Sequence, residues 1–291
     1  MVGHETVLGE LADLADRGSL GHGYIFFGPD MVGKRTVARA IAERLESLAP
    51  AMMPPRQAAS EAILVDYLEI GCPSGVSSIG IDAVREAQRF LWQMPGISPR
   101  RTLVIDDAHL MTVEAQNALL KIAEEPPASS LLILVASDPE GILATIRSRL
   151  PSIYFGTVSG GAIAEWLLTR DIEEKSARDA AMRAFGKPGL AIRLASDGEL
   201  RGRLDLAARF LAAPAVSRRD VIKKIIEPED FDFRRFLDAV VIILAWGIAR
   251  GPGAKPPTAQ ERERWHRALR LYERETRFAL NPRLQLEALM L

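Results

Sequence analysis

The sequence predicts an α/β fold, with a helix-covered parallel sheet in the first half of the chain and only helices after it. Short apolar runs alternate with segments of helical periodicity as far as Phe155. The run at residues 131–135 is apolar at every position, which is typical of a parallel strand buried on both faces. After Phe155 the strand signal stops. We therefore expect an α/β domain followed by helical domains.

The first elements alternate between helix and strand. A helix is expected over residues 5–17, where apolar side chains recur at the spacing of one helical face. Residues 24–27 are aromatic and β-branched and end at Gly28, so they predict a strand that runs into a turn. A second helix is expected over 33–48, and the Pro- and Ala-rich residues 49–60 predict a loop. The remaining strands and helices of this domain are expected at 63–70, 81–92, 102–106, 113–124, 131–137 and 153–155.

Two helical parts follow this domain, which we expect to span residues 1–157. Residues 158–212 open with a flexible Ser-Gly-Gly joint and form short helices, interrupted by Gly-Lys-Pro-Gly at 186–189. Residues 213–291 are helical again, with a Gly- and Pro-rich break at 251–257. The apolar helix before that break is expected to form a core, and the charged helix after it a solvated face.

The composition is that of a packed globular protein. Of the 291 residues, 48% are hydrophobic and 26% charged, which argues against a disordered chain. The formal net charge of −1 excludes a global basic field for nucleic acid. The single cysteine, Cys72, excludes an internal disulfide and fits a reducing cytosol. With no secretory signal and no apolar segment long enough to cross a bilayer, we expect a cytoplasmic protein without membrane contact.

The strongest chemical motif is a phosphate-binding loop at residues 28–34, Gly-Pro-Asp-Met-Val-Gly-Lys. It lies between an expected strand and an expected helix, the setting in which backbone N–H groups and the helix N-terminus hold phosphates. Gly28 and Gly33 bound the turn, and Lys34 would reach the outer phosphate oxygens. The alternative is a glycine-rich turn with an exposed lysine.

This motif is incomplete at the position that normally binds magnesium. A Ser or Thr hydroxyl is expected there, and the residue is Arg35. Thr36 is the next residue, but one helical step turns a side chain by about 100°, so its hydroxyl should point away from the metal. The loop is expected to bind phosphates with weak or absent magnesium coordination.

The apolar residues 103–105 lead into a second nucleotide-binding motif, Asp106-Asp107. In such motifs the first acid helps to hold the metal and the second polarises the attacking water. Asp107 stands where an ATPase of this kind carries Glu, and its shorter side chain would displace the base. Taken alone, the two aspartates could equally be a solvated strand end.

Further motifs occur in the order in which they stand in a known protein family. They are His-Gly-Tyr-Ile-Phe-Phe-Gly-Pro at 22–29, Asp-Asp-Ala-His at 106–109, Asn-Ala-Leu-Leu-Lys at 117–121, Glu-Glu-Pro-Pro at 124–127, Thr-Ile-Arg-Ser-Arg at 145–149 and Asn-Pro-Arg-Leu-Gln-Leu-Glu at 281–287. With these motifs the chain resembles the AAA+ clamp-loader subunits, and within them the delta-prime type of the bacterial DNA polymerase III clamp loader. The resemblance spans nearly the whole chain.

The resemblance implies an AAA+ P-loop core at 1–157, a helical lid at 158–212 and a helical collar at 213–291. Through the collar five subunits form an open ring, which uses ATP to open a sliding clamp and place it on primed DNA during replication. The delta-prime type is a scaffold that no longer hydrolyses ATP, so no independent ATPase or polymerase activity is expected of this chain. Its implied partners are gamma/tau-type ATPase subunits and a delta subunit, and the clamp and DNA through the complex. It would act in the cytoplasm, in the nucleoid-associated replication machinery.

The resemblance also implies which cofactors the subunit takes. None is required, and the loop is compatible with ATP or ADP bound with weak or absent magnesium. Members of the family often carry a four-cysteine zinc module between the two nucleotide motifs. One thiolate cannot build that site, so no zinc is expected.

The same resemblance makes Arg149 an arginine finger for a neighbouring subunit, because Ser148-Arg149-Leu150 matches the family's Ser-Arg-Cys motif. A guanidinium supplied in trans stabilises the charge on a transferring phosphate. From chemistry alone, Arg149 would be a surface arginine in an ordinary salt bridge, and nearby Arg147 is the second candidate. Ser137 stands at the family's first sensor position, with a strand-end cap as the alternative. Gly189 replaces the sensor arginine of an active lid.

Three functions therefore remain open on the sequence. The favoured one is the non-hydrolysing scaffold that donates Arg149. The second is a hydrolysing gamma/tau-type ATPase, which requires Thr36 or a water as metal ligand and Asp107 in place of Glu. The third is an unrelated small P-loop enzyme such as a kinase, for which the Glu-Glu-Pro-Pro and Ser-Arg motifs would be coincidences.

Overall fold

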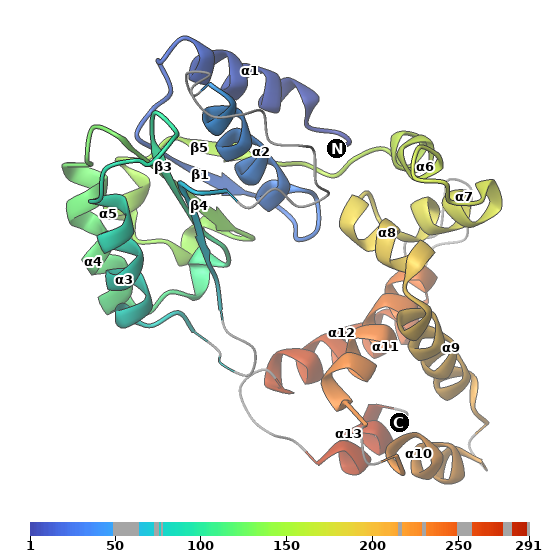
Figure 1. Cartoon of the computed structure of the whole chain (residues 1–291). Helices are drawn as coiled ribbons and strands as arrows, with labels where there is room; N and C mark the ends of the chain where they lie inside the picture. Colours follow the sequence, from blue (N-terminus) through green and yellow to red (C-terminus); the bar gives the residue numbers. More distant parts are fainter. Residues whose placement is uncertain are drawn as a thin grey trace. The chain divides into compact units, whose positions relative to one another are not determined.

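The computed structural model describes residues 1–48, 64–72, 76, 78–214, 217–228, 231–248, 258–275 and 281–289. These residues form two compact units, Met1–Ala191 and Ile192–Leu291 (Figure 1). The expected loop at 49–60 and the break at 251–257 lie outside the described residues. The finer division into core, lid and collar stays a prediction.

A parallel sheet of five strands organises the first unit, in the order β2-β3-β4-β1-β5. Because all neighbours are parallel, the carboxyl ends of β1, β3 and β4 lie at one edge of the sheet. This edge is where a ligand binds in an open α/β sheet. The strands are β1 Gly23–Phe27, β2 Tyr67–Ile70, β3 Arg101–Ile105, β4 Ser130–Ala136 and β5 Ser152–Tyr154.

Helices cover both faces of this sheet (Figure 1). One face packs against α1 (Glu5–Asp16) and α2 (Lys34–Ser47), and the other against α3 (Ile81–Leu91), α4 (Val113–Glu124) and the short α5 (Ala144–Arg147). β4 is buried at every position, and its alternate residues enter the two cores. The apolar run therefore forms a fully buried parallel strand, as expected.

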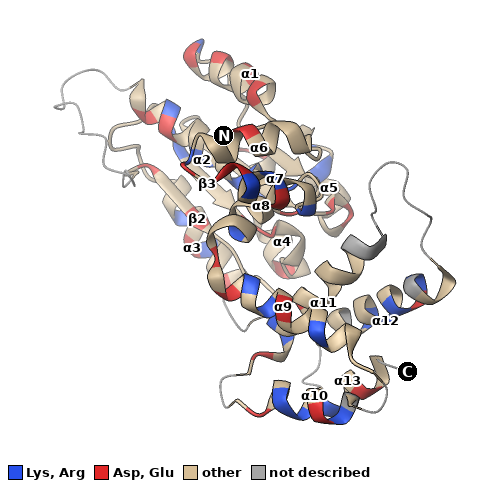
Figure 2. Ribbon diagram, turned by 90° about the vertical axis from the view of Figure 1, so that its right-hand side faces the viewer, with Lys and Arg blue, Asp and Glu red and all other residues tan. Residues whose placement is uncertain are grey.

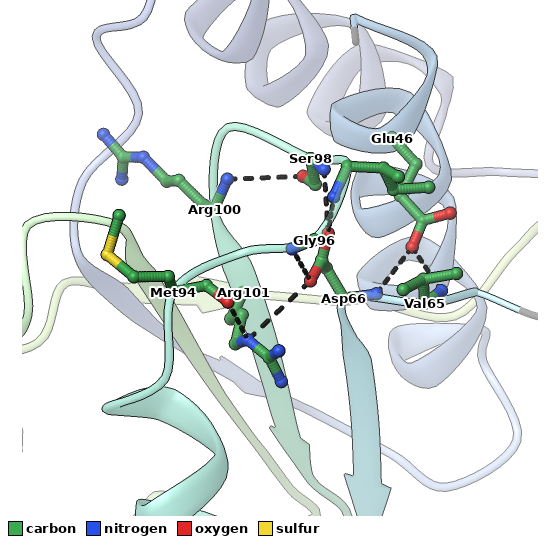
Figure 3. Close-up of polar contacts among 9 residues, drawn as sticks. Glu46, Val65, Asp66, Met94, Gly96, Ser98, Arg100 and Arg101 are labelled. Atoms are coloured by element: carbon green, nitrogen blue, oxygen red, sulfur yellow. Dashed lines mark hydrogen bonds and ion pairs between the residues drawn. The ribbon is translucent and has the colours of Figure 1, made fainter. Parts of the chain in front are cut away.

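The amino end of β2 is held by one buried carboxylate, Asp66 (Figure 3). Its two oxygens accept hydrogen bonds from the backbone N–H groups of Gly96 (2.7 Å), Ile97 (2.7 Å) and Ser98 (2.8 Å). Arg101 Nε lies 3.7 Å from Asp66 Oδ1. Burial opposes the charge, but the three amide bonds and Arg101 outweigh it and hold the pKa of Asp66 below its usual range. This carboxylate therefore joins β2 to the loop that leads into β3.

β2 is shorter than the strand expected from residue 63. Residue 63 lies outside the described part, and residues 64–66 are not strand. The physical reason is the side chain of Glu46, which accepts the N–H groups of Val65 (2.6 Å) and Asp66 (2.8 Å). Those two donors are therefore engaged by a side chain, and the regular ladder starts at Tyr67.

The helices α6 (Gly160–Leu168), α7 (Glu174–Arg183) and α8 (Pro188–Ser196) follow β5. The interruption expected at 186–189 is shorter than predicted, because α8 begins at Pro188 and takes Gly189 into its first turn. Proline is well tolerated there, since the first helical N–H has no partner within the helix. In the described part of the chain no strand follows Tyr154.

The second unit is helical. α11 (Phe233–Ile248) packs against α9 (Gly198–Ala212) and α12 (Ala259–Glu275), and the rings of Phe210 and Phe236 meet edge to face at 5.7 Å. α10 (Arg218–Ile226) packs against α13 (Pro282–Leu289). α12 carries basic residues at several positions, with acidic residues between them in its sequence (Figure 2). Among the described residues, no helix has the length and apolar character that a membrane crossing requires.

Candidate nucleotide site

The loop after β1 has the backbone conformation that a phosphate-binding turn needs. Gly28 has φ +135°, and a Cβ there would lie 2.1 Å from the carbonyl oxygen of Phe155, so no other residue fits. Gly33 has φ +115° and caps α2 at its N-terminus. Met31 is left-handed as well, with φ +62°. The strand, turn and helix thus stand in the order expected from the sequence.

Lys34 is turned into this loop. Its side chain is only 6% exposed, so the alternative of an exposed lysine is wrong. The Nζ donates to the carbonyl oxygens of Gly28 (2.6 Å) and Pro29 (2.7 Å) and lies 3.8 Å from Asp30 Oδ1. Burial lowers the pKa of the Lys34 ammonium, and the charges of Asp30 and Asp106 partly offset that effect. To hold a phosphate, the ammonium would have to exchange these carbonyls for the ligand.

Arg35 contacts the residues that would bind a metal. Its Nε forms an ion pair with Glu69 of β2, and its Nη1 lies 3.9 Å from Asp106 Oδ2. Thr36 is exposed. Magnesium takes oxygen ligands in octahedral geometry, and here a guanidinium stands beside the carboxylate that would supply one of them. The residues present therefore do not fit a magnesium-bound nucleotide of the usual kind.

Asp106, Asp107 and Ser137 come together at the carboxyl edge of the sheet, as expected. Asp107 follows β3 with φ +52°, and its backbone N–H donates to Asp106 Oδ1 at 3.0 Å. Burial, and then the charge of Asp106, raise the pKa of the Asp107 carboxyl. Ser137 follows β4, and its Oγ lies 3.1 Å from His109 Nε2. The hydroxyl that would face a γ-phosphate thus already has a partner within the chain.

Gly189 lets α8 approach the loop closely. Its backbone N–H donates to the carbonyl oxygen of Met31 at 2.9 Å. A Cβ at residue 189 would lie 3.1 Å from both the Cβ and the carbonyl oxygen of Met31. An arginine at this position would therefore require a small displacement of the helix or of the loop.

His4 supports the loop from the N-terminal side, a role that the spacing of the histidines did not suggest. Its ring is buried, and Nε2 lies 3.0 Å from the carbonyl oxygen of Val32. A carbonyl can only accept, so Nε2 carries the proton. Burial, against Phe155 among others, lowers the pKa of His4.

Arg149 lies away from this site. Residue 149 comes three residues before β5, at the amino edge of the sheet, whereas the loop follows the carboxyl end of β1. Arg149 Nη2 forms an ion pair with Glu124 Oε1 at 2.6 Å, and Nη1 donates to the carbonyl oxygen of Thr145 at 2.7 Å. The structure therefore does not bring Arg149 and the loop of the same chain together.

Arg147 is bound more firmly than Arg149. Two of its nitrogens donate to the two carboxylate oxygens of Glu140, at 2.5 and 3.0 Å. Such a bidentate pair is directional and holds the guanidinium plane in place. Arg147 is therefore less free than Arg149 to reach outward.

Three residues that contact predicted site residues were given no role of their own from the sequence: Glu69, Glu124 and His109. Glu124 belongs to the Glu-Glu-Pro-Pro motif, so its position was marked but its partner was not. His109 likewise lies in the Asp-Asp-Ala-His motif, whereas Glu69 belongs to no motif, and the partners of both lie on other elements. Among the described residues, no group of three or more His, Cys, Asp or Glu side chains is placed to hold a metal ion.

Known proteins match this chain in sequence and in fold. The family described as "DNA polymerase III, delta subunit" matches residues 3–159. DNA polymerase III subunit gamma/tau of Mycobacterium tuberculosis is 35% identical over 157 residues, 51% of this chain and 27% of that protein. DNA polymerase III subunit delta' of Escherichia coli is 35% identical over 130 residues, 44% of this chain and 39% of that protein. The matched stretch thus spans less than half of either relative's own length.

One solved structure matches along nearly the full chain. It is a DNA polymerase III gamma subunit-related protein of Thermotoga maritima, with a TM-score of 0.63 and 19% identity over 97% of both chains. At this identity the likeness establishes the fold.

Proposed function

This chain belongs to the DNA polymerase III delta-subunit family of AAA+ clamp-loader proteins, and we propose that it is a non-hydrolysing, delta-prime-type scaffold that donates Arg149 to a neighbouring subunit's ATP site. In this role it would join gamma/tau-type ATPase subunits and a delta subunit. Together they would load a sliding clamp on primed DNA.

The observation that carries the proposal is the placement of Arg149. It lies at the sheet edge opposite the loop of its own chain and is 37% exposed. A guanidinium in this position does not contact a phosphate bound by the loop of its own chain. It is available instead to a nucleotide held by another subunit, where a finger contributes about 10³–10⁵ in rate in well-studied GTPases.

The chain's own site supports the non-hydrolysing part of the proposal. Arg35 stands in place of a metal-binding hydroxyl, and Asp107 in place of a longer catalytic base. Gly189 brings backbone rather than a cationic side chain to the loop. If ATP or ADP binds, we expect Lys34 and the loop amides to hold it with weak or absent magnesium.

The test uses a ring assembled from this chain with the gamma/tau-type and delta subunits of the same organism. Primed-DNA-stimulated ATPase is compared between the wild-type chain, Arg149→Ala, Lys34→Ala and the matched control Arg147→Ala. We expect Arg149→Ala to abolish at least the turnover of the neighbouring site. Lys34→Ala and Arg147→Ala should leave the rate close to wild type.

A gamma/tau-type ATPase is the second candidate, because relatives of that type match this chain as well and Lys34 and Asp106 are present. Under that function Lys34→Ala would lower the ring's ATPase and Arg149→Ala would have the smaller effect. That pattern would overturn the scaffold proposal.

A further inference from the structure

The carboxylate of Glu124 engages Arg149 in the chain by itself. Glu124 Oε1 lies 2.6 Å from Arg149 Nη2, and the Thr145 carbonyl and the Ser148 hydroxyl accept from Nη1 at 2.7 and 3.3 Å. All of these partners belong to the same chain, so the guanidinium is held against the surface of that chain. To meet a phosphate of another subunit, it must give up at least the carboxylate.

Helix stability does not explain a carboxylate at this position. Glu124 is the last residue of α4, where the macrodipole disfavours negative charge and favours a cation such as Lys121 in the same turn. The Glu124 side chain is 48% exposed, so it is not needed to fill a core. Its clear contact is the ion pair with Arg149.

The ion pair of Glu124 with Arg149 is weak enough to be broken when another anion competes for the arginine. Both side chains are more than a third exposed, and exposed ion pairs contribute only about 0.2–1 kcal/mol, equivalent to about 1.5- to 5-fold. The neighbouring pair of Arg147 and Glu140 is bidentate, with the arginine 30% exposed. Glu140 is itself 71% exposed, so the difference between the two arginines rests on the bidentate geometry of the Arg147 pair, which holds that guanidinium the more firmly.

Building on the proposed function, we infer that Glu124 is a positioning residue that holds Arg149 back until a phosphate of the neighbouring subunit competes for it. If only a fraction of the Arg149 side chains is free of Glu124, the apparent affinity of Arg149 for a phosphate falls to that fraction of its intrinsic affinity. Glu124 therefore competes with the phosphate for Arg149. Removing its charge should raise the ATPase activity of the neighbouring subunit rather than lower it.

The first arm of the test measures the free chain. Phenylglyoxal modifies accessible arginines, and mass spectrometry follows its rate at Arg149. We expect Glu124→Gln to raise that rate about 1.5- to 5-fold, the range that an exposed ion pair implies. Glu140→Gln is the matched control, which should raise the rate at Arg147 and leave Arg149 unchanged.

The second arm uses the assembled ring. Glu124→Gln should raise kcat/KM for ATP about 1.5- to 5-fold, whether the finger acts on the bound or the reacting phosphate. The double variant Glu124→Gln/Arg149→Ala should show no such gain, because the effect runs through Arg149. A merely structural role of Glu124 would lower kcat/KM.

An unchanged modification rate at Arg149, or an unchanged or lower kcat/KM in a ring where Arg149→Ala is strongly impaired, would overturn this inference and leave the proposed function standing. A ring unaffected by Arg149→Ala would instead overturn the proposed function, and this inference with it.

Discussion

At the scale of single residues, we expect Arg35 to limit what the loop can bind. A cation is already present between Glu69 and Asp106, at the position where a metal-binding hydroxyl would bring magnesium. The side chain is 63% exposed, so the ion pairs contribute little to folding stability. Their main expected effect is on whether magnesium can bind together with a nucleotide.

Replacing Arg35 should therefore change the metal dependence of nucleotide binding. In Arg35→Thr a hydroxyl takes the place of the guanidinium, and Asp106 is freed for a metal. We expect magnesium to strengthen binding of a fluorescent ATP analogue by about tenfold or more, equivalent to ~1.4 kcal/mol, and to have little effect on wild type. Titrations with magnesium and with EDTA measure this, and Lys34→Ala in the same background is the control. Equal magnesium dependence in wild type would contradict the role given to Arg35.

His4 should make folding stability depend on pH. Burial lowers its folded pKa below the ordinary value of 6.5, so the unfolded chain binds the proton more readily. The unfolding free energy is then highest above pH 6.5 and falls as the pH drops toward the folded pKa, by at most ~1.4 kcal/mol per pH unit. Urea unfolding at pH 7.5 and 5.5 tests this against His4→Gln, whose amide can still donate to Val32. The same pH slope in both proteins would refute the prediction.

At the scale of elements, the sheet and its helices were predictable because their signals are local. The apolar run of β4 and the periodicity of α4 appear in the sequence, and the bounds of α4 are the expected ones. The four-residue α5 is too short to show a period, and it was not expected.

The candidate site was predictable only in part. Glycines and acids at strand ends reveal the loop and Asp106, because their spacing follows the order strand, turn and helix. The ion pair of Arg35 with Glu69, and the approach of Gly189 to Met31, join residues far apart in the chain. Such contacts depend on how elements pack, which a single sequence does not record.

The link between β2 and the loop before β3 gives a prediction at this scale. Asp66→Asn places an amide NH₂ among three N–H donors and leaves Arg101 without its charge partner. We expect a loss of about 2–4 kcal/mol in unfolding free energy, from the range for buried charged hydrogen bonds. Urea unfolding of both proteins at pH 7 measures it.

The sign of the pH dependence follows from the lowered pKa of Asp66. Its contribution to stability is fully present above the ordinary carboxyl pKa and is lost as the pH falls through the lowered folded value. Below neutral pH, Asp66→Asn should therefore lose stability less steeply than wild type. Parallel curves down to pH 3 would show that this carboxylate does not hold β2.

At the scale of the whole molecule, the parallel sheet separates the residues of the two proposed roles at its two edges. The loop, Asp106 and Ser137 share the carboxyl edge, and Arg149 stands at the amino edge before β5. A parallel sheet brings all strand ends of one kind to the same side. Topology alone thus places the candidate nucleotide site and the proposed arginine finger apart, as the proposed exchange between neighbouring subunits of a ring would require.

The division into two compact units gives a last prediction, that the first unit folds without the second but does not act in the ring without it. Both core clusters of the sheet lie within residues 11–155, and the first unit ends at residue 191. A fragment of residues 1–197, cut at the N-cap of α9, should therefore fold alone and unfold in one cooperative transition. It retains Arg149 and Glu124, but lacks α9 of the expected lid and the helices α10 to α13 of the expected collar at 213–291.

In a ring assay this fragment should give no stimulation of ATPase at concentrations where the full chain saturates. A finger that is not held beside its neighbour loses the effective concentration that assembly supplies. Circular dichroism melting establishes that the fragment is folded, and titration of the fragment against the full chain measures its activity. A folded fragment that stimulated as well as the full chain would show that residues 192–291 are not needed to bring Arg149 to its partner. The proposed collar role would then fail, while the role of Arg149 would stand.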